Sequence, residues 1–200
     1  MSVGVIVLAA GASQRMGQPK ALLHLEGRSL LQRIVEQARA LPAQEIVVTL
    51  AAPHGPQVSK EVDYLRSKLG ADGLHEAWNP APERGMLSSV QCGLSLISLL
   101  AAQLSGALIW PVDLPRVQRA TLCQILDVAV SQPGLIVPTY CGRGGHPLWL
   151  PRALFAEALA LPSEQGLRAL RERHPPCFVP VEDEEILRDL DTPEDWRRAH

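Results

Sequence analysis

A glycine-containing loop directly follows the first apolar run of the chain and carries two cations. The run Val3–Ala10 leads into Gly11, and Arg15 and Lys20 come shortly after it. Small residues let a backbone approach a ligand closely, and successive amide N–H groups in such a turn form a concave anion site. A guanidinium grips phosphate oxygens as a fork, and an ammonium acts as a point charge. The loop therefore predicts a phosphate site, with an ordinary loop bearing two solvated cations as the alternative.

A carboxylate stands at the end of a second apolar run. The residues Ala107–Val112 are followed by Asp113, Leu114 and Pro115. In open α/β sheets, ligands lie above the carboxyl ends of the strands. Mg²⁺ usually takes only one or two protein carboxylates together with substrate phosphates. We therefore expect Asp113 to bind Mg²⁺, the alternative being an aspartate that caps the next helix.

A second glycine loop precedes residues Met86–Leu104, which predict a long helix. Gly85 and Met86 lead into this helix, and Ser88 and Ser89 lie in its first turns. The free N–H groups of a helix N-terminus, together with nearby hydroxyls, suit a base edge or an anion. The pattern favours a nucleoside pocket, and simple helix capping by Ser88 is the alternative.

The candidate site residues can meet only if the fold brings the ends of several strands together. The sequence supports such a fold, because segments typical of strands alternate with segments typical of helices. Continuous β-branched runs indicate buried strands, and amphipathic segments indicate helices. The expected strands are Val3–Ala10, Glu45–Ala51, Leu74–Trp78, Ala107–Val112, Gly134–Thr139, Pro147–Leu150 (antiparallel) and Cys177–Val181. The expected helices are Ser29–Ala40 (with Ser29 as N-cap), Gln57–Leu69, Met86–Leu104, Thr121–Val130, Arg152–Leu161, Glu164–Arg173 and one that starts at Pro193. This order predicts an α/β fold, a three-layer α/β/α Rossmann-like sandwich with a mostly parallel mixed sheet, formed by residues 1–200 as a single domain.

The composition restricts the classes of function. Of the 200 residues, 46% are hydrophobic and 20% are charged, which indicates a packed core. The net charge of −2 argues against a general nucleic-acid binder, which normally carries a basic stripe. Every apolar stretch is shorter than the about 18 residues of a membrane span, and the four cysteines are scattered without a CxxC pair. We expect a cytoplasmic protein with reduced thiols and neither a membrane nor a nucleic-acid partner.

The sequence LAAGASQRMGQPK, from Leu8 to Lys20, resembles the signature of the nucleotidyltransferases that activate sugars, isoprenoid precursors and the molybdenum cofactor. Within this MobA-like NTP transferase family, the likeness is greatest to the molybdenum cofactor cytidylyltransferase branch. The resemblance covers most of the chain, and this first motif is its most specific part. It implies that the loop holds a triphosphate, with Arg15 and Lys20 neutralising charge around the α-phosphorus.

Three further motifs extend this resemblance. The segment Asn79–Leu94 is similar to the family's second motif, in which a Gly-Met loop and a serine at a helix start line the nucleoside pocket. The turn that starts at Asp113 matches the family's metal-binding DxP. The segment Asp189–Asp195 matches DIDTPED closely. Because two acids one residue apart on a strand point to opposite faces, we expect either Asp189 or Asp191 to reach the metal.

The segment Gly142–Pro147 resembles the GHP segment of the cytidylyltransferase branch, which borders the pterin-side substrate. A structural histidine and a solvated arginine are the alternatives there. The catalytic residues that the resemblance implies are Arg15, Lys20 and Asp113. The implied nucleotide contacts are Leu8, Ala9, Ala10, Gly11, Ala12, Ser13, Arg15, Lys20, Asn79, Gly85, Met86, Ser88 and Ser89. The implied metal ligands are Asp113 with Asp189 or Asp191, and the implied acceptor contacts are Arg143, Gly145 and His146.

One segment departs from the branch. Residues Pro162–Arg168 stand where the branch carries a GDxGAR-like stretch; Gly166 and Arg168 fit loosely, but the Gly-Asp pair is Ser-Glu here. This departure concerns the acceptor more than the nucleotidyl chemistry. In the family, LAAG accompanies pyrimidine nucleotides and LAGG accompanies GTP, so Ala10 favours CTP.

The expected function is a Mg²⁺-dependent transfer of the nucleoside monophosphate part of CTP to a phosphorylated acceptor, molybdopterin by resemblance, with release of pyrophosphate. The enzymatic alternatives are a guanylyltransferase of the same cofactor and a transferase acting on a sugar phosphate or methylerythritol phosphate. A non-catalytic nucleotide-binding regulator or cofactor chaperone is the alternative from another class. The joint presence of Arg15, Lys20 and Asp113 argues against it, since simple binding needs no metal at the α-phosphate.

Overall fold

The computed structural model describes residues 1–11, 18–162, 165–191 and 193–198 of the chain. In these ranges the main sheet contains β1 (Val3–Leu8), β4 (Ala43–Leu50), β5 (Leu74–Trp78), β6 (Gly106–Pro111), β7 (Ile136–Tyr140), β8 (Arg143–Gly144), β9 (Leu148–Pro151) and β10 (Cys177–Pro180). The α-helices are α1 (Leu30–Arg39), α2 (Gly55–Leu69), α3 (Met86–Leu100), α4 (Arg119–Ser131), α5 (Phe155–Ala160), α6 (Gly166–Arg173) and α7 (Pro193–Arg198). Short 3-10 helices include η1 (Lys20–Leu22), η2 (Pro82–Arg84), η3 (Arg152–Leu154) and η5 (Glu184–Leu187).

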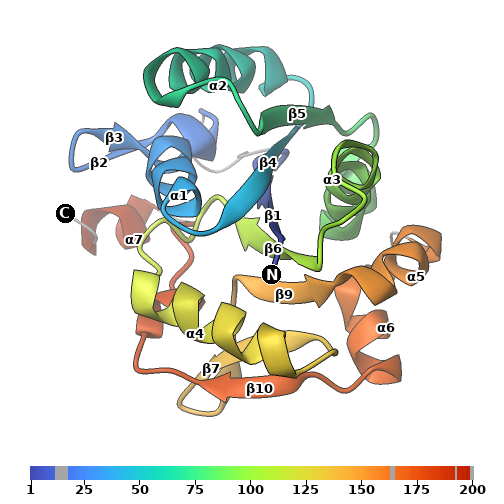
Figure 1. Ribbon diagram of the computed structural model, residues 1–200. Coiled ribbons are helices and arrows are strands. Elements are labelled where there is room, and N and C mark those ends of the chain that lie inside the picture. Colours follow the sequence, from blue (N-terminus) through green and yellow to red (C-terminus); the bar gives the residue numbers. More distant parts are fainter. Residues whose placement is uncertain (12–17, 163–164, 192, 199–200) are drawn as a thin grey trace.

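The sheet is mixed and lies between two layers of helices (Figure 1). Its strand order is β10, β7, β9, β6, β1, β4 and β5, with β8 paired to β7. β9 runs antiparallel to β6 and β7, whereas β1 pairs in parallel with both β4 and β6. One hydrophobic cluster joins the sheet to α1, α2 and α4, and a second joins it to α3, α5 and α6. The expected three-layer α/β/α sandwich with a mostly parallel mixed sheet is therefore confirmed.

The central strand β1 shows why this sequence is buried on both sides. Every residue of β1 is buried. Val5 and Val7 belong to the cluster with α1, whereas Ile6 and Leu8 belong to the cluster with α3. Since successive side chains of a strand point to opposite faces, an apolar run without alternation is what two covered faces require.

Helix α3 packs against β1 at very short range. A Cβ on Gly93 would lie 2.5 Å from Cγ2 of Ile6, and a Cβ on Gly4 would lie 2.5 Å from Cδ1 of Ile97. The two glycines therefore let the helix and the strand approach each other. This contact places the N-terminus of α3 near the carboxyl ends of the central strands.

Most element boundaries agree with the expected ones to within a few residues, and Ser29 is the N-cap of α1, with its Oγ accepting from Gln32 N at 3.0 Å. The expected helix at 86–104 ends at Leu100, however. A small hairpin of β2 (His24–Leu25) and β3 (Arg28–Ser29) was not expected at all. Its turn holds Glu26 and Gly27 at positive φ, 53° and 77°, which is the geometry of a tight two-residue hairpin.

No helix in the described ranges has the length and apolar character needed to cross a membrane. The four cysteines are unpaired, as expected from their spacing. That residues 1–200 form a single domain stays a prediction.

Candidate active site

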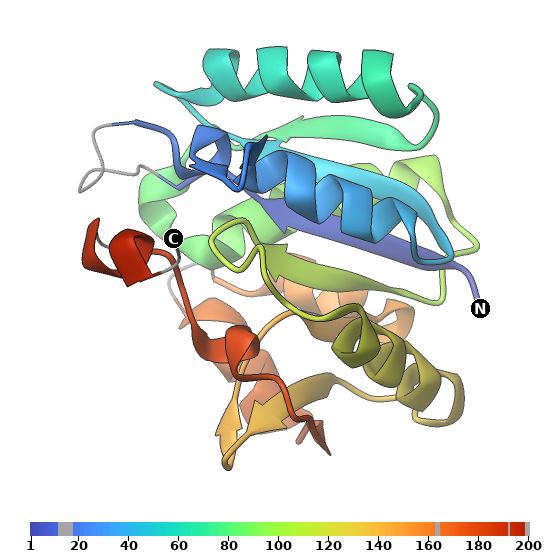
Figure 2. The same ribbon diagram turned by 90° about the vertical axis from the view of Figure 1, so that its left-hand side faces the viewer.

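Three segments meet at the carboxyl edge of the central strands. The loop after β1 begins at Ala9, the turn after β6 contains Asp113, and the C-terminal segment reaches the same edge before it forms α7 (Figure 2). Two backbone hydrogen bonds fix this meeting point: Val112 N donates to Leu8 O at 3.2 Å, and Leu190 N donates to Asp113 O at 3.0 Å. The edge where ligands bind in open α/β sheets is thus built from residues far apart in the sequence.

Lys20, the first residue of η1, contacts two carboxylates at this edge. Its Nζ lies 3.3 Å from Oδ2 of Asp113 and also donates a hydrogen bond to Oδ1 of Asp191. Burial opposes the charge of the ammonium, but the hydrogen bonds and negative charges of the two aspartates outweigh it and raise the pKa of Lys20. Two acids from distant segments therefore converge on one positive charge.

The two acids of the C-terminal motif differ in their surroundings. Residues 188–191 form no strand, so the expectation that Asp189 and Asp191 alternate along a strand is wrong. The N–H of the intervening Leu190 is bonded to the turn after β6 instead of to a strand ladder. Asp191 contacts Lys20, while Asp189 is exposed. Surrounding atoms nevertheless remove part of the water from the Asp189 carboxyl, which raises its pKa, and the charges of Asp113 and Asp191 raise it further.

The carboxylates described at this edge do not form a complete metal site. Among the described residues, no group of three or more His, Cys, Asp or Glu side chains is arranged to hold a metal ion. Asp113 and Asp191 share the Lys20 ammonium, and their role as metal ligands stays a prediction. Two carboxylates match what Mg²⁺ usually takes from a protein when substrate phosphates supply further oxygens.

The loop after β1 is described as far as Gly11. Leu8 and Ala10 are buried, and Ala9 N donates to Thr49 O at 3.2 Å. Among the described residues, no heavy atom other than those of its chain neighbours lies within 4 Å of the position that a Cβ on Gly11 would take, so the side-chain position of Gly11 is uncrowded. Three predicted contacts of this loop lie outside the described residues: Ala12, Ser13 and Arg15.

In the second glycine loop, the predicted polar residues bond to one another. Asn79 is 3% exposed, and its Nδ2 donates to Ser88 Oγ at 2.8 Å and to Ser89 Oγ at 2.9 Å. Its Oδ1 accepts from Ala81 N at 2.9 Å, and Ser88 Oγ donates to Gly85 O at 2.7 Å. These side chains therefore hold the loop onto the start of α3. Their contact with a base stays a prediction.

The start of α3 is open to solvent. Gly85 has a φ of 93°, in the left-handed region that favours glycine, and the side chain of Met86 is 47% exposed. The helix begins at Met86 without a side-chain cap, so Ser88 does not cap this helix as the alternative interpretation expected. Exposed backbone at a helix N-terminus suits a polar ligand.

The predicted acceptor residues lie on the segment after β7. Arg143 is exposed in β8. Gly145 is buried, and a Cβ at this position would overlap the carbonyl oxygen of Ile186. His146 N donates to the same carbonyl at 3.1 Å. The glycine is thus required for close contact between this segment and the C-terminal segment.

Charged groups from two different segments act on the imidazole of His146. Burial lowers the pKa of His146 and the charge of Arg171 adds to this, while a hydrogen bond with the backbone of Ile109 and the charge of Asp113 act against it. Its Nδ1 is buried and accepts or donates no hydrogen bond within the described part of the chain. His146 therefore lies within electrostatic reach of the Asp113 site.

Sequence reasoning missed Asp183, which is 1% exposed. Its Oδ2 accepts from Gln118 N at 2.8 Å and from Thr121 Oγ1 at 2.7 Å, and its Oδ1 accepts from Glu185 N at 3.2 Å. Asp183 thus attaches the C-terminal segment to the start of α4. The segment VEDEE gives no signal that singles out this acid, because the two donors that attach it to α4 lie more than sixty residues away in the sequence.

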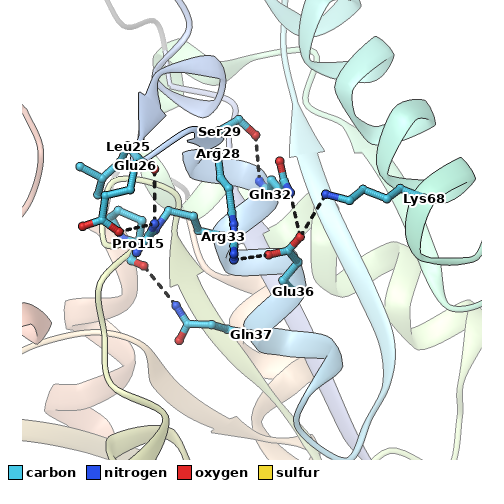
Figure 3. A network of polar contacts seen from close by, with 10 residues as sticks. All are labelled: Leu25, Glu26, Arg28, Ser29, Gln32, Arg33, Glu36, Gln37, Lys68 and Pro115. Atoms are coloured by element: carbon cyan, nitrogen blue, oxygen red, sulfur yellow. Dashed lines mark hydrogen bonds and ion pairs between the residues drawn. The ribbon is translucent and has the colours of Figure 1, made fainter.

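The hairpin that follows Lys20 and the turn after β6 are both attached to α1 (Figure 3). Arg33 Nη1 donates to Leu25 O at 3.3 Å and to Glu26 Oε2 at 3.0 Å. Gln37 Nε2 donates to Pro115 O at 3.1 Å. These contacts hold the lysine-bearing segment and the Asp113 turn against the same helix.

An open cavity lies beside Asp191, between the turn after β6 and the C-terminal segment. Its lining combines positive and negative side chains with two leucines: Arg116, Glu185, Leu187, Arg188, Asp189, Leu190, Asp191 and Asp195.

The family model of the MobA-like NTP transferase domain matches residues 5–177 of the chain. This range includes Lys20, Asp113 and the segment with His146, and it ends before the C-terminal acids.

Two curated proteins illustrate the similarity. The molybdenum cofactor cytidylyltransferase of Escherichia coli (strain K12) is 25% identical over 198 residues, which cover 99% of this chain and 95% of that protein. The molybdenum cofactor guanylyltransferase of Rhizobium meliloti (strain 1021) is 30% identical over 175 residues, which cover 87% of this chain and 72% of that protein.

Solved structures of one protein are also similar. The crystal structure of Rv0371c from Mycobacterium tuberculosis H37Rv superimposes with a TM-score of 0.80 at 29% identity, covering 98% of this chain and 96% of that chain. A complex of Rv0371c with manganese superimposes with a TM-score of 0.76 at 26% identity, covering 100% and 98%. A divalent cation therefore binds a protein of the same architecture.

Proposed function

The chain belongs to the MobA-like NTP transferase family, and on this premise we propose that it transfers the nucleoside monophosphate part of CTP to a phosphorylated acceptor, with release of pyrophosphate. By likeness to the curated relatives, the acceptor is molybdopterin or a closely related form of the molybdenum cofactor. The reaction takes place in the cytoplasm.

The observation that carries this proposal is the position of Lys20. Its ammonium lies 3.3 Å from Asp113 Oδ2 and bonds to Asp191, at the edge where the loop after β1 leaves the sheet. A fixed cation and two carboxylates at the edge where the glycine loop leaves the sheet suit a triphosphate with its metal. A site for simple anion binding would not need two acids beside its lysine.

In the proposed reaction, an oxygen of the acceptor phosphate forms a bond to the α-phosphorus while the bond from that phosphorus to the bridging oxygen breaks. Pyrophosphate takes the electron pair and leaves. The acceptor phosphate is already ionised, so no general base is needed. Lys20, with Arg15, offsets negative charge on the leaving group, and catalysis consists of positioning and charge stabilisation.

The side chains present fit a magnesium ion. Asp113 and Asp191 converge on a single positive charge, which the Lys20 ammonium provides in this structure. Of Asp189 and Asp191, we propose Asp191 as the ligand, because it is partly buried and accepts a hydrogen bond from Lys20, whereas Asp189 is exposed. When bound, Mg²⁺ supplies positive charge to the α-phosphate and the leaving pyrophosphate.

The direct test is release of pyrophosphate by the purified protein with Mg²⁺ and molybdopterin, comparing CTP, GTP, ATP and UTP. Asp191→Asn and Asp189→Asn form a matched pair, since both remove one negative charge from the same segment. Only Asp191→Asn is expected to raise the Mg²⁺ concentration needed for half-maximal rate. If none of the four nucleotides gives pyrophosphate although nucleotide binds in a Mg²⁺-dependent way, the non-catalytic regulator or chaperone is favoured.

The choice of base rests on Ala10, which is buried in the loop after β1. A methyl at this position narrows the floor of the base site, which favours the smaller pyrimidine. The guanylyltransferase relative, at 30% identity, is the observation that favours GTP instead. Ala10→Gly is therefore expected to improve kcat/KM for GTP relative to CTP. An unchanged ratio would mean that Ala10 does not select the base.

A further inference from the structure

Arg171 differs from the neighbouring arginines of α6. Arg168 pairs with Glu172 at 2.9 Å, and Arg173 pairs with Glu157 at 3.1 Å. Arg171 is partly buried, and within the described ranges no hydrogen bond or ion pair joins its guanidinium to another side chain or to the backbone. Withdrawing a charge from water without a partner costs free energy, so an unpaired, partly buried guanidinium indicates a position that a ligand can complete.

The guanidinium faces the glycine segment after β7. A Cβ on Gly144 would lie 3.6 Å from Nη2 of Arg171 and 3.1 Å from Cγ1 of Val137. Because Gly144 has no side chain, nothing from this position covers the guanidinium. A larger residue there would stand between Arg171 and an incoming ligand.

His146 connects this arginine with the proposed reaction centre. The charges of both Arg171 and Asp113 act on its ring, and Gly144, which adjoins the guanidinium of Arg171, lies two residues before His146. Its buried Nδ1 has no hydrogen-bond partner among the described residues, and a buried polar atom in this state normally has a ligand or a water as its partner. The guanidinium of Arg171 and the Nδ1 of His146, neither of which has a hydrogen bond within the described ranges, therefore both adjoin the segment after β7.

We propose that Arg171, with His146 beside it, binds an oxyanion of the acceptor substrate. This inference rests on the proposed nucleotidyl transfer. A guanidinium presents two parallel N–H donors, which match the oxygens of a phosphate or carboxylate group. Arg168, at the position that resembles the family's arginine, is unsuited to this role because its side chain is 86% exposed and paired with Glu172. The inward-facing arginine of this helix lies one turn later.

The test uses inorganic phosphate as the probe and Arg168 as the matched control on the same helix. The nucleotide site is first filled with Mg²⁺ and α,β-methylene-CTP, which cannot transfer its nucleotide. Phenylglyoxal then modifies accessible arginines, and mass spectrometry follows Arg168 and Arg171 separately. Phosphate at ten times its dissociation constant is expected to slow modification of Arg171 by about tenfold and to leave Arg168 unchanged. Equal rates with and without phosphate at Arg171 would overturn the proposal.

Thermal shifts separate this inference from the proposed function. With the analogue bound, phosphate is expected to stabilise the wild type and Arg168→Met but not Arg171→Met. If Arg171→Met keeps the phosphate shift, the inference fails while nucleotide transfer stands. If Mg²⁺ and the analogue alone do not raise the Tm of the wild type, the protein does not bind the nucleotide, and the proposed function is overturned. With molybdopterin as acceptor, Arg171→Met is expected to raise the KM for the acceptor while the KM for CTP stays unchanged.

Discussion

The two carboxylates that meet at Lys20 are held by different means. Asp113 lies two residues after the end of β6, which is paired with β1 on one side and β9 on the other. Its turn is closed by Leu114 N donating to Pro111 O at 3.2 Å and by Trp110 Nε1 donating to Leu114 O at 3.0 Å. Asp191 lies on an irregular segment without a strand ladder.

The irregular segment depends on a few buried contacts instead of a sheet. Asp183 attaches it to the start of α4, Leu190 is 5% exposed and bonds to the Asp113 turn, and Ile186 O accepts from His146. Loss of one strand hydrogen bond leaves many others in place, whereas loss of a buried carboxylate leaves several donors without partners. The C-terminal segment is therefore where the site can be disturbed without damage to the sheet.

Asp113→Ala is expected to have the largest effect on rate and little effect on stability. The hydrogen bonds that close the turn are made by backbone groups and by Trp110, so they survive the substitution. Loss of a preorganised charge is expected to lower kcat by a factor of about 10²–10³, or ~3–4 kcal/mol. Pyrophosphate release at saturating Mg²⁺ measures this loss. Near-normal turnover would remove Asp113 from the metal site.

In contrast to Asp113→Ala, Asp183→Ala is expected to lower the free energy of unfolding clearly. It leaves Gln118 N, Thr121 Oγ1 and Glu185 N without their acceptor. Unsatisfied buried donors suggest a loss of about 2 kcal/mol, or roughly 4–8 °C in Tm for a chain of this size. The half-saturating Mg²⁺ concentration is expected to rise as well, because Asp191 lies on the segment that is released.

Thr121→Val is the matched control for this prediction. It removes one donor to Asp183 but leaves the carboxylate and its two backbone hydrogen bonds in place. A smaller stability loss of about 1 kcal/mol is expected, with an unchanged Mg²⁺ dependence. If both variants change Mg²⁺ dependence equally, Asp183 acts through general stability, and its position on the Asp191 segment has no special role.

The sequence was sufficient to predict that the loop after β1 and the turn with Asp113 lie at the same edge of the sheet. Periodicity places strands and helices because burial repeats along them, and the carboxyl ends of parallel strands meet by geometry alone. The loop after β1 and Asp113 therefore come together without knowledge of any side-chain contact.

The other half depends on long-range contacts that leave no periodic signal. The strand expected at Asp189 and Asp191 does not form, and the inward orientation of Arg171 is visible only once α6 lies against Gly144. The sequence also gives no sign that the side chain of Asn79 bonds to Ser88 and Ser89, and the contact of Asn79 with a nucleotide stays a prediction. Residue type predicts that a group is polar, while the fold decides which partner it finds.

Glu36→Gln is expected to have the smallest effect on stability and rate, because several other contacts hold the hairpin and the Asp113 turn against α1. Glu36 on α1 accepts from Gln32 Nε2 at 2.8 Å and pairs with Arg28 at 2.9 Å and Lys68 at 3.6 Å (Figure 3). Arg28 and Lys68 are both largely exposed, so the loss is about 0.5 kcal/mol. The contacts of Arg33 and Gln37 remain, and kcat is expected to stay unchanged.

The pH dependence of this variant separates the ion pairs from other effects of the substitution. Burial raises the pKa of Glu36, but the hydrogen bond from Gln32 and the charges of Arg28 and Lys68 outweigh it and hold the pKa below its ordinary value of 4.5. The ionised carboxylate therefore contributes stability above pH 4.5, and this contribution is lost as the pH falls through the lowered pKa. Urea unfolding of the wild type and Glu36→Gln should show a difference at pH 7 that disappears in acid. If Glu36→Gln instead costs more stability than Asp183→Ala, the hairpin side depends on single contacts as the C-terminal segment does, and the contrast between the two regions is wrong.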